Sequence, residues 1–385
     1  MPQDPSSRTD VAVIGGGVIG LAVAWRAAGQ GHRVCVLERG ELGAGASHVA
    51  AGMLAPVTEA DAGELALLAL GLRSARAWPA FAAELEQAAG ADPGLRRSGA
   101  LVVARDRDEA EALERELALR LELGLEVRRL LPSAARRLEP ALAPTVRLAL
   151  GVAGDHSADP RALVRALAQA ARRAGATLRT GARVARIECS GGRVTGVGLA
   201  GGEVVHADRV VVAAGAWSGA IDGLPRIPLR PVKGQILRLR DPAHHGPPAL
   251  LTRIVRFGGG YLVPRGDGRY VLGATMEERG FDTTLTAGGL YELLRDAGEL
   301  VPGVHEMVIE EMSAGLRPAT PDNAPVLGPA EELAGLHWAT GHHRNGILLA
   351  PVTADIVVGG LDAGDAGAEP VSPAFAAARF GRVAA

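Results

Sequence analysis

The sequence predicts an α/β fold with two domains: one holds a mostly parallel sheet, the other antiparallel strands and helices, and the chain crosses between them. Apolar runs at residues 10–14 and 34–38 flank a helical stretch at 18–30, which is a strand–helix–strand unit. Short strand patterns separated by turns fill residues 177–215 and 227–311. The 385 residues also exceed the usual size of one domain.

The remaining elements follow from the periodicity of apolar residues. Asp159 precedes Pro160 at the start of a helical pattern, where an aspartate caps a helix and proline suits the first turn. The short strands before residue 215 predict a small meander that returns to the parallel sheet. We predict helices at 64–89, 106–124, 160–175, 287–299 and 347–359, strands at 177–178, 184–188, 194–199, 204–205, 210–213, 236–239, 261–264, 270–273 and 336–340, and a loose tail at 361–385.

Composition excludes several classes of protein. The net charge is −2 and 22% of residues are charged, so we expect no nucleic-acid partner. Residues 1–9 are polar and unlike a secretory signal, and no segment offers the roughly 18 apolar residues of a membrane span. Cys35 and Cys189 have no metal-ligand spacing. We therefore expect a reduced, cytoplasmic protein that does not associate with membranes.

Two histidine pairs could suggest a metal site. His244 and His245 lie in a Pro/Gly-rich loop, and His342 and His343 lie in a glycine-flanked segment. Neither pair has a carboxylate or a cysteine at metal-ligand spacing. We expect no metal.

A glycine motif follows the first strand. Gly15-Gly16-Gly17-Val18-Ile19-Gly20 has the G-x-G-x-x-G pattern and opens a helix, and Glu38 ends the next strand about 20 residues on. The glycines permit a tight turn and close approach of a pyrophosphate, the helix N-terminus attracts the phosphates, and the carboxylate can hold ribose hydroxyls. The segment predicts a Rossmann-type dinucleotide site.

Three further segments indicate which dinucleotide is bound. They are Ala213-Ala214-Gly215-Ala216-Trp217, the run 46–54 and Gly341-His342-His343-Arg344-Asn345-Gly346-Ile347. Together they resemble the D-amino-acid oxidase and sarcosine oxidase superfamily of FAD-dependent oxidoreductases. Within it the chain is most similar to the glycine oxidases of thiamine biosynthesis, through segments at 51–56, 230–235, 261–265, 273–276, 315–318 and 341–351.

The resemblance implies an enzyme that binds FAD non-covalently and oxidises glycine, and in addition sarcosine or small D-amino acids, to an imine while O₂ becomes H₂O₂. The imine of glycine supplies thiazole synthesis, and the family is often tetrameric. Two alternatives remain open. One is a D-amino-acid or secondary-amine dehydrogenase that passes electrons to a quinone, and the other is a flavin-binding protein without oxidase activity.

The resemblance also assigns the residues of the site. Arg317 binds the substrate carboxylate, Arg344 contacts substrate, Tyr261 places its hydroxyl near the carboxylate, and Met276 forms a wall of the pocket. The FAD-binding domain comprises residues 1–75, 147–222 and 312–385, and the substrate domain 76–146 and 223–311. The FAD-contacting residues are Gly15, Gly17, Val18, Ile19, Gly20, Glu38, Arg39, Ala46, Ser47, Ala51, Gly52, Met53, Val184, Ala214, Gly215, Trp217, His342, His343, Arg344, Asn345, Gly346, Ile347 and Leu348.

Physical chemistry supports parts of this assignment independently. Arg317 follows a predicted strand at 312–316 and precedes Pro318, which predicts a loop position, and its planar fork suits a carboxylate. Taken alone, one arginine among many is more often a surface residue. The N-terminus of the helix at 347–359 would point at the Gly-His-His-Arg-Asn-Gly segment and stabilise negative charge on a reduced flavin. Lys233 lies in a strand motif, and no C-terminal cysteine is available to tether a flavin.

Overall fold

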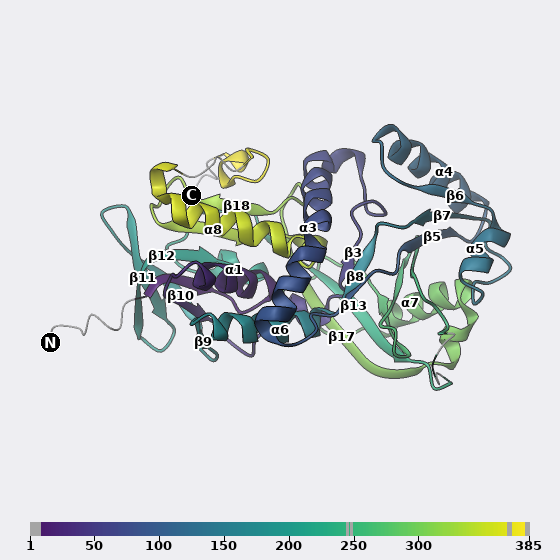
Figure 1. Cartoon of the computed structure of the whole chain (residues 1–385), viewed down its shortest axis with the longest axis horizontal. Helices are drawn as coiled ribbons and strands as arrows, with labels where there is room; N and C mark the ends of the chain where they lie inside the picture. The colour runs from purple at the N-terminus through teal and green to yellow at the C-terminus, as the bar shows by residue number, and fades with distance from the viewer. Residues whose placement is uncertain (1–8, 244–245, 247–248, 368–371, 382–385) are drawn as a thin grey trace.

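The computed structural model describes residues 9–243, 246, 249–367 and 372–381. Two large sheets occupy opposite halves of an elongated molecule, and helix α3 (Leu65–Ala89) stands between them (Figure 1). A three-stranded sheet also lies between the halves; it contains β3 (Met53–Leu54), β8 (His156–Ala158) and β4 (Leu95–Arg96).

The first sheet contains the predicted strand–helix–strand unit. Strands β1 (Thr9–Ile14) and β2 (Val34–Leu37) pair in parallel, and helix α1 (Val18–Gly29) connects them. Strands β12 and β19 continue the parallel part, and β10 and β11 form the expected antiparallel meander. The other strands are β9 (Thr177–Arg179), β10 (Val184–Ser190), β11 (Arg193–Leu199), β12 (Val204–Val212), β18 (Val326–Pro329) and β19 (Leu336–Thr340).

Helices α6 (Pro160–Arg173) and α8 (Ala350–Gly367) pack against α1, and α3 packs against both. The prediction for the start of α6 is confirmed, because the Asp159 carboxylate accepts hydrogen bonds from the backbone N–H groups of Arg161 and Ala162. The apolar faces of these helices form one core with the first sheet, and that core includes the T-shaped aromatic pair of Trp78 and Phe81.

The second sheet contains the antiparallel strands that the sequence predicts between residues 227 and 311, together with β5, β6 and β7, which the sequence analysis does not predict. Its strand order is β17-β13-β16-β15-β14-β5-β7-β6, and all neighbours are antiparallel except β14 and β5. Helix α7 (Ala287–Leu300) packs on β13, β15 and β16, and α4 (Arg107–Glu122) packs on β5 and β7. The strands are β5 (Ala100–Ala104), β6 (Arg128–Leu130), β7 (Leu148–Val152), β13 (Arg230–Arg240), β14 (Ile254–Phe257), β15 (Gly260–Pro264), β16 (Arg269–Gly273) and β17 (Val308–Ala319), with α5 (Pro132–Leu138) beside β6.

Four expectations about local structure are wrong. The strands predicted at 204–205 and 210–213 are one continuous strand, β12, which pairs with β11 at its start and with β1 at its end. Arg317 lies inside β17, paired with Val232, rather than in a loop, because β13 continues opposite it. Helix α8 begins at Ala350 instead of residue 347, after the 3₁₀ turn η5 (His343–Asn345), and it extends to Gly367. The tail is ordered in part, since Phe375 is buried and its carbonyl accepts the N–H of Leu327.

The predicted division into domains stays a prediction, but two of its borders fall inside elements. The border at 75/76 cuts α3, whose apolar face packs on α6 and α8, and the border at 311/312 cuts β17. Strand β7, placed in the FAD-binding part by the prediction, pairs within the second sheet.

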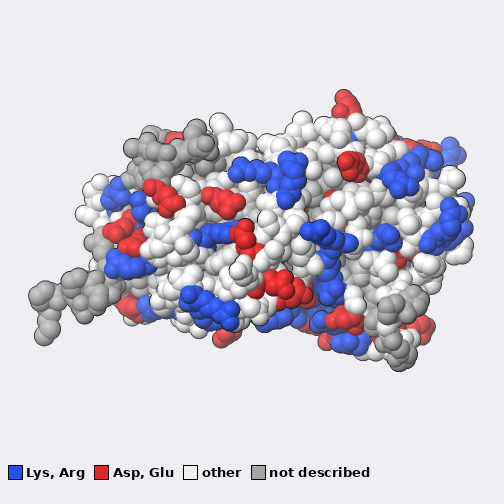
Figure 2. All heavy atoms as spheres, viewed as in Figure 1, with Lys and Arg blue, Asp and Glu red and all other residues white. Residues whose placement is uncertain are grey.

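Charge is dispersed over the face seen in Figure 2, where Lys and Arg side chains alternate with Asp and Glu side chains. Among the described residues, no helix is long and apolar enough to cross a membrane.

Candidate active site

A cavity of about 1570 Å³ runs from the N-terminal end of α1 to the β13–β17 side of the second sheet. Its walls come from both large sheets and from the segment that contains α2 (Ala46–Val49). Such a volume accommodates a dinucleotide together with a small substrate.

Glycines shape the end of the cavity at α1. Gly15 has φ +108°, and a Cβ atom there would lie 2.4 Å from the carbonyl oxygen of Ala213. A Cβ atom on Gly20 would lie 2.0 Å from the carbonyl oxygen of Gly15, so only glycine lets α1 approach the strand. Gly20 therefore has the packing role that the motif predicts.

Backbone amides at this end hold two side chains. The Glu38 carboxylate accepts hydrogen bonds from Gly16 N at 2.7 Å and Gly40 N at 3.0 Å. Ser47 Oγ accepts from Val18 N at 3.0 Å, in the first turn of α1. Helix α1 has no acidic residue in its first turn and no side-chain cap at Gly17, so apart from the Val18 N–H that Ser47 binds, its positive end is available to an anion.

The structure brings nearly all predicted FAD-contacting residues to this cavity. Three do not line it: Gly20 packs under the strand, Asn345 is buried behind the wall, and the Leu348 carbonyl accepts hydrogen bonds from Ser74 Oγ and Trp78 Nε1. Those that line it are Gly15, Gly17, Val18, Ile19, Glu38, Arg39, Ala46, Ser47, Ala51, Gly52, Met53, Val184, Ala214, Gly215, Trp217, His342, His343, Arg344, Gly346 and Ile347. Their individual contacts with a cofactor stay predictions.

Trp217 forms a stack at the mouth of the cavity. The Arg39 guanidinium lies 3.6 Å from the Trp217 ring centroid, and the Phe281 ring centroid lies 5.9 Å away. Because Phe281 belongs to the loop after β16, this stack joins the two halves of the molecule.

His343 is the residue whose surroundings best fit a bound group. Its backbone has φ +46°, and neither imidazole nitrogen has a hydrogen-bond partner although both are buried. Burial, with Arg344 and Arg317 nearby, lowers the pKa of His343 to about 3, so the ring is neutral. An orphaned neutral imidazole on the cavity wall fits a cofactor that supplies the missing partner. His342 differs, because its Nε2 lies 2.9 Å from Thr353 Oγ1.

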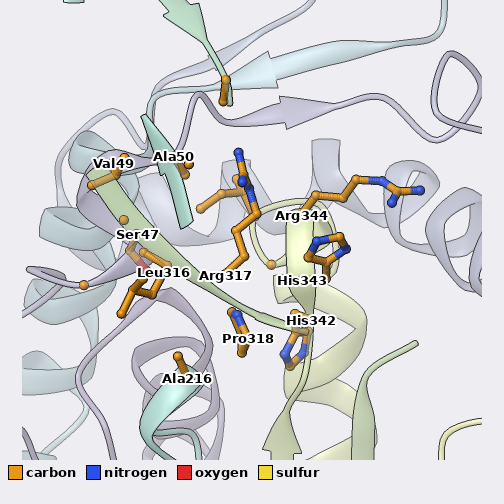
Figure 3. A pocket seen from close by; sticks show the side chains of 18 of the residues that line it. Ser47, Val49, Ala50, Ala216, Leu316, Arg317, Pro318, His342, His343 and Arg344 are labelled. Carbon is orange, nitrogen blue, oxygen red and sulfur yellow. The ribbon is translucent and has the colours of Figure 1, made fainter. Parts of the chain in front are cut away.

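Arg317 and Tyr261 lie together on the cavity wall. The Arg317 side chain extends from β17 into the cavity (Figure 3), and its Nη1 donates to the Thr275 carbonyl at 3.1 Å. No carboxylate forms an ion pair with Arg317 within the described chain. Burial raises the pKa of Tyr261 while the neighbouring Arg317 lowers it, so the phenol stays protonated. The pair presents a guanidinium fork and a hydroxyl donor.

Arg344 and Met276 also line the cavity, but in different surroundings. Arg344 Nη2 lies 2.6 Å from Glu64 Oε2, and its Nε lies 3.5 Å from Glu59 Oε2. In Figure 3 the Arg344 side chain points away from Arg317. The Met276 side chain is largely exposed at the mouth. Contact of either residue with substrate stays a prediction.

The sequence analysis expects no metal and places Lys233 in a strand. No group of three or more metal-ligating side chains occurs in the described ranges, and His244 and His245 lie outside them. Lys233 is buried and does not line the cavity; its ammonium binds the Thr284 carbonyl and Glu277.

Sequence reasoning missed Thr58, Glu59 and Arg256, which line the cavity beside Tyr261. Glu59 and Arg256 are almost 200 positions apart and belong to no motif. Only the packing of the segment 55–64 against the second sheet brings them together.

Comparison with known proteins agrees with this geometry. A family model described as FAD dependent oxidoreductase matches residues 10–359. Glycine oxidase from Geobacillus kaustophilus is 37% identical over 355 residues, which cover 91% of this chain and 92% of that protein. The bifunctional protein ThiO/ThiG from Trichormus variabilis is 36% identical over 349 residues, which cover 90% of this chain but 52% of that longer protein.

The fold is similar to a solved structure as well. The crystal structure of glycine oxidase from Geobacillus kaustophilus superimposes with a TM-score of 0.89 and 36% identity, covering 97% of this chain and 99% of the other. The family match spans the glycine motif, the Arg317–Tyr261 pair and the His343 segment. The chain therefore belongs to the family of FAD-dependent oxidoreductases.

Proposed function

We propose that the protein oxidises glycine, and in addition sarcosine or small D-amino acids, with O₂ as the final electron acceptor. For glycine the balanced reaction is glycine + O₂ → iminoacetate + H₂O₂. The observation that carries the proposal is Arg317, a guanidinium on the cavity wall with carbonyl partners and no ion pair among the described residues. The similarity to glycine oxidases over nine-tenths of the chain supports the same substrate.

FAD, when bound, supplies the acceptor for the two electrons and the hydrogen that leave the substrate carbon and reduces O₂. The N-terminal end of α1 and the amides near Glu38 and Ser47 would hold the pyrophosphate and ribose part. His343 would satisfy its orphaned nitrogens on the cofactor.

The chain's own contribution to the reaction is mainly placement. The Arg317 fork binds the substrate carboxylate through charge-assisted hydrogen bonds, and the Tyr261 hydroxyl donates to the same group. When the carboxylate is bound at the β17 wall, the amine and the α-carbon of the substrate are held in a fixed position relative to the cofactor end of the cavity. Such positioning supplies a large part of catalysis when no side chain has to transfer a proton at carbon.

The resemblance to the glycine oxidases of thiamine biosynthesis leads us to propose that the imine serves thiazole synthesis. A relative named ThiO/ThiG, in which this chain matches about half of the length, is consistent with such a link. We also propose a cytoplasmic homo-oligomer, a tetramer by family resemblance, which light scattering of the purified protein tests.

The decisive experiment is anaerobic reduction of the purified flavoprotein. Glycine, sarcosine and D-alanine are added separately while the visible flavin absorbance is followed, and air is then admitted. Bleaching by glycine that air reverses with release of H₂O₂ is the expected result. Bleaching that air fails to reverse would favour the dehydrogenase, and a protein purified without flavin would overturn the proposal.

A further inference from the structure

Three arginines line the part of the cavity around Tyr261. They are Arg256, Arg317 and Arg344, and they come from three separate elements of the chain. Arg256 and Arg317 act electrostatically on the Tyr261 phenol, and Arg344 and Arg317 on the His343 ring. A small substrate bound at Arg317 is therefore within the field of all three guanidinium groups.

Glu59 forms ion pairs with two of these arginines. Its Oε2 lies 3.5 Å from Arg344 Nε, and its Oε1 lies 3.8 Å from Arg256 Nη2. The Glu59 side chain is 13% exposed and lines the cavity. Glu64 binds Arg344 from behind, at 2.6 Å, and does not line the large cavity.

The segment that carries Glu59 is held rigidly. The buried Asp155 carboxylate accepts hydrogen bonds from Val57 N at 3.2 Å and Thr58 N at 2.7 Å. The buried Arg120 guanidinium donates to the carbonyls of the same two residues, both at 2.8 Å. These hydrogen bonds hold the backbone on the N-terminal side of Glu59 from both edges, and so place the Glu59 side chain beside Arg256 and Arg344.

Of these three arginines, Arg317 is the one without an ion-pair partner among the described residues; the Asp61 carboxylate, which also lines the cavity, accepts the Gly63 N–H and pairs with none of the three. Glu59 and Glu64 offset two of the three arginines, and Glu277, which also lines the cavity, is matched by Lys233 at 3.3 Å. The remaining cation is Arg317. One unmatched guanidinium complements a single carboxylate, whereas a second carboxylate would meet Glu59 and be repelled.

We propose that Glu59 is the specificity-determining residue that restricts the site to amines with one carboxylate. The proposal rests on the proposed function, because it takes Arg317 as the group that binds the substrate carboxylate. Glu59 acts by repelling a second carboxylate and by keeping Arg256 and Arg344 unavailable to it.

The test compares the wild-type flavoprotein with Glu59→Gln, Glu59→Asp and Glu64→Gln. Initial rates of H₂O₂ release give kcat/KM for glycine and for iminodiacetate, a secondary amine with two carboxylates. Binding is measured separately through the flavin absorbance change on titration with glycolate, which has one carboxylate, and malonate, which has two. Glu64→Gln is the matched control, since it removes a carboxylate from Arg344 behind the cavity wall.

In the wild type we expect malonate to bind at least about tenfold more weakly than glycolate, because one carboxylate is repelled. Glu59→Gln should raise the iminodiacetate-to-glycine ratio of kcat/KM by about tenfold, whereas Glu59→Asp and Glu64→Gln should change it by less than about threefold. An unchanged ratio in Glu59→Gln, or an equal rise in Glu64→Gln, would overturn the proposal.

If Glu59→Gln fails to fold, equal binding of malonate and glycolate to the wild type would still refute the proposal, and weaker malonate binding would support it. Failure of the proposed function is distinguishable, since glycine would then not bleach the wild-type flavin at all.

Discussion

Replacing Arg317 by methionine removes the unmatched guanidinium of the cavity and keeps an unbranched side chain of comparable length in β17. The substrate carboxylate then loses a bidentate, charge-assisted partner in a cavity that is partly open to water. Each such hydrogen bond is worth roughly 1.5–3 kcal/mol, so the loss of transition-state binding should be about 3 kcal/mol after allowance for the open mouth. At 1.4 kcal/mol per factor of ten, kcat/KM for glycine should fall by about 100-fold.

The effect on folding should be much smaller. Arg317 donates to the carbonyls of Thr275 and Lys233, and neutral hydrogen bonds of this kind contribute about 1 kcal/mol each. Arg317→Lys keeps the charge but lacks the planar fork, so its kcat/KM for glycine should be about tenfold lower than that of the wild type. Arg240→Met is the matched control, because Arg240 lies on β13, binds Glu310 at the surface and does not line the cavity.

The assay measures initial rates of H₂O₂ release over a range of glycine concentrations, with flavin content and melting temperature recorded for each variant. Arg317→Met protein that retains flavin and kcat/KM within about threefold of the wild type would refute the reasoning, since removal of a charged partner should cost far more than that. An equal loss in Arg240→Met would show that the effect is unspecific.

Three further outcomes follow from the structure. Burial raises the pKa of Asp155 from 3.8 to about 6, so the folded state binds this proton more tightly than the unfolded chain does. The free energy of unfolding therefore includes the full contribution of this proton below about pH 4 and decreases by about 3 kcal/mol as the pH rises through 6. In Asp155→Asn the free energy of unfolding, measured with urea, should depend less on pH between 4 and 6; the same pH dependence as in the wild type would contradict the assignment. Glu38→Gln places an amide donor against Gly16 N or Gly40 N and should weaken FAD binding by about tenfold in fluorescence titration of the apoprotein. Gly20→Ala should abolish flavin retention because its Cβ would lie 2.0 Å from a carbonyl oxygen, whereas Gly29→Ala, with open space around it, should bind flavin normally.

The amino-acid sequence alone was sufficient for the features that depend on short stretches of chain. The strand–helix–strand unit, the glycine turn and the Asp159 cap each involve residues within a few tens of positions, so periodicity and residue type determine them. The order of the family's segments along the chain was also sufficient to indicate the FAD-dependent family, which the family match confirms. Nearly all the predicted site residues in those segments line one cavity; Gly20, Asn345 and Leu348 do not.

Packing of distant segments decided the rest. Arg317 was expected in a loop, but the pairing of β17 with β13 makes it part of a strand. Contact of Arg344 with substrate stays a prediction, but the sequence did not indicate that Glu59 and Glu64, about 280 positions earlier, bind its guanidinium. Which carboxylate pairs with which arginine depends on side-chain direction, burial and separation in space, and no local pattern encodes these. The sequence therefore determined the cofactor class and proposed Arg317 as the carboxylate-binding residue, whereas the tertiary structure decided which of the charged residues around Arg317 form ion pairs.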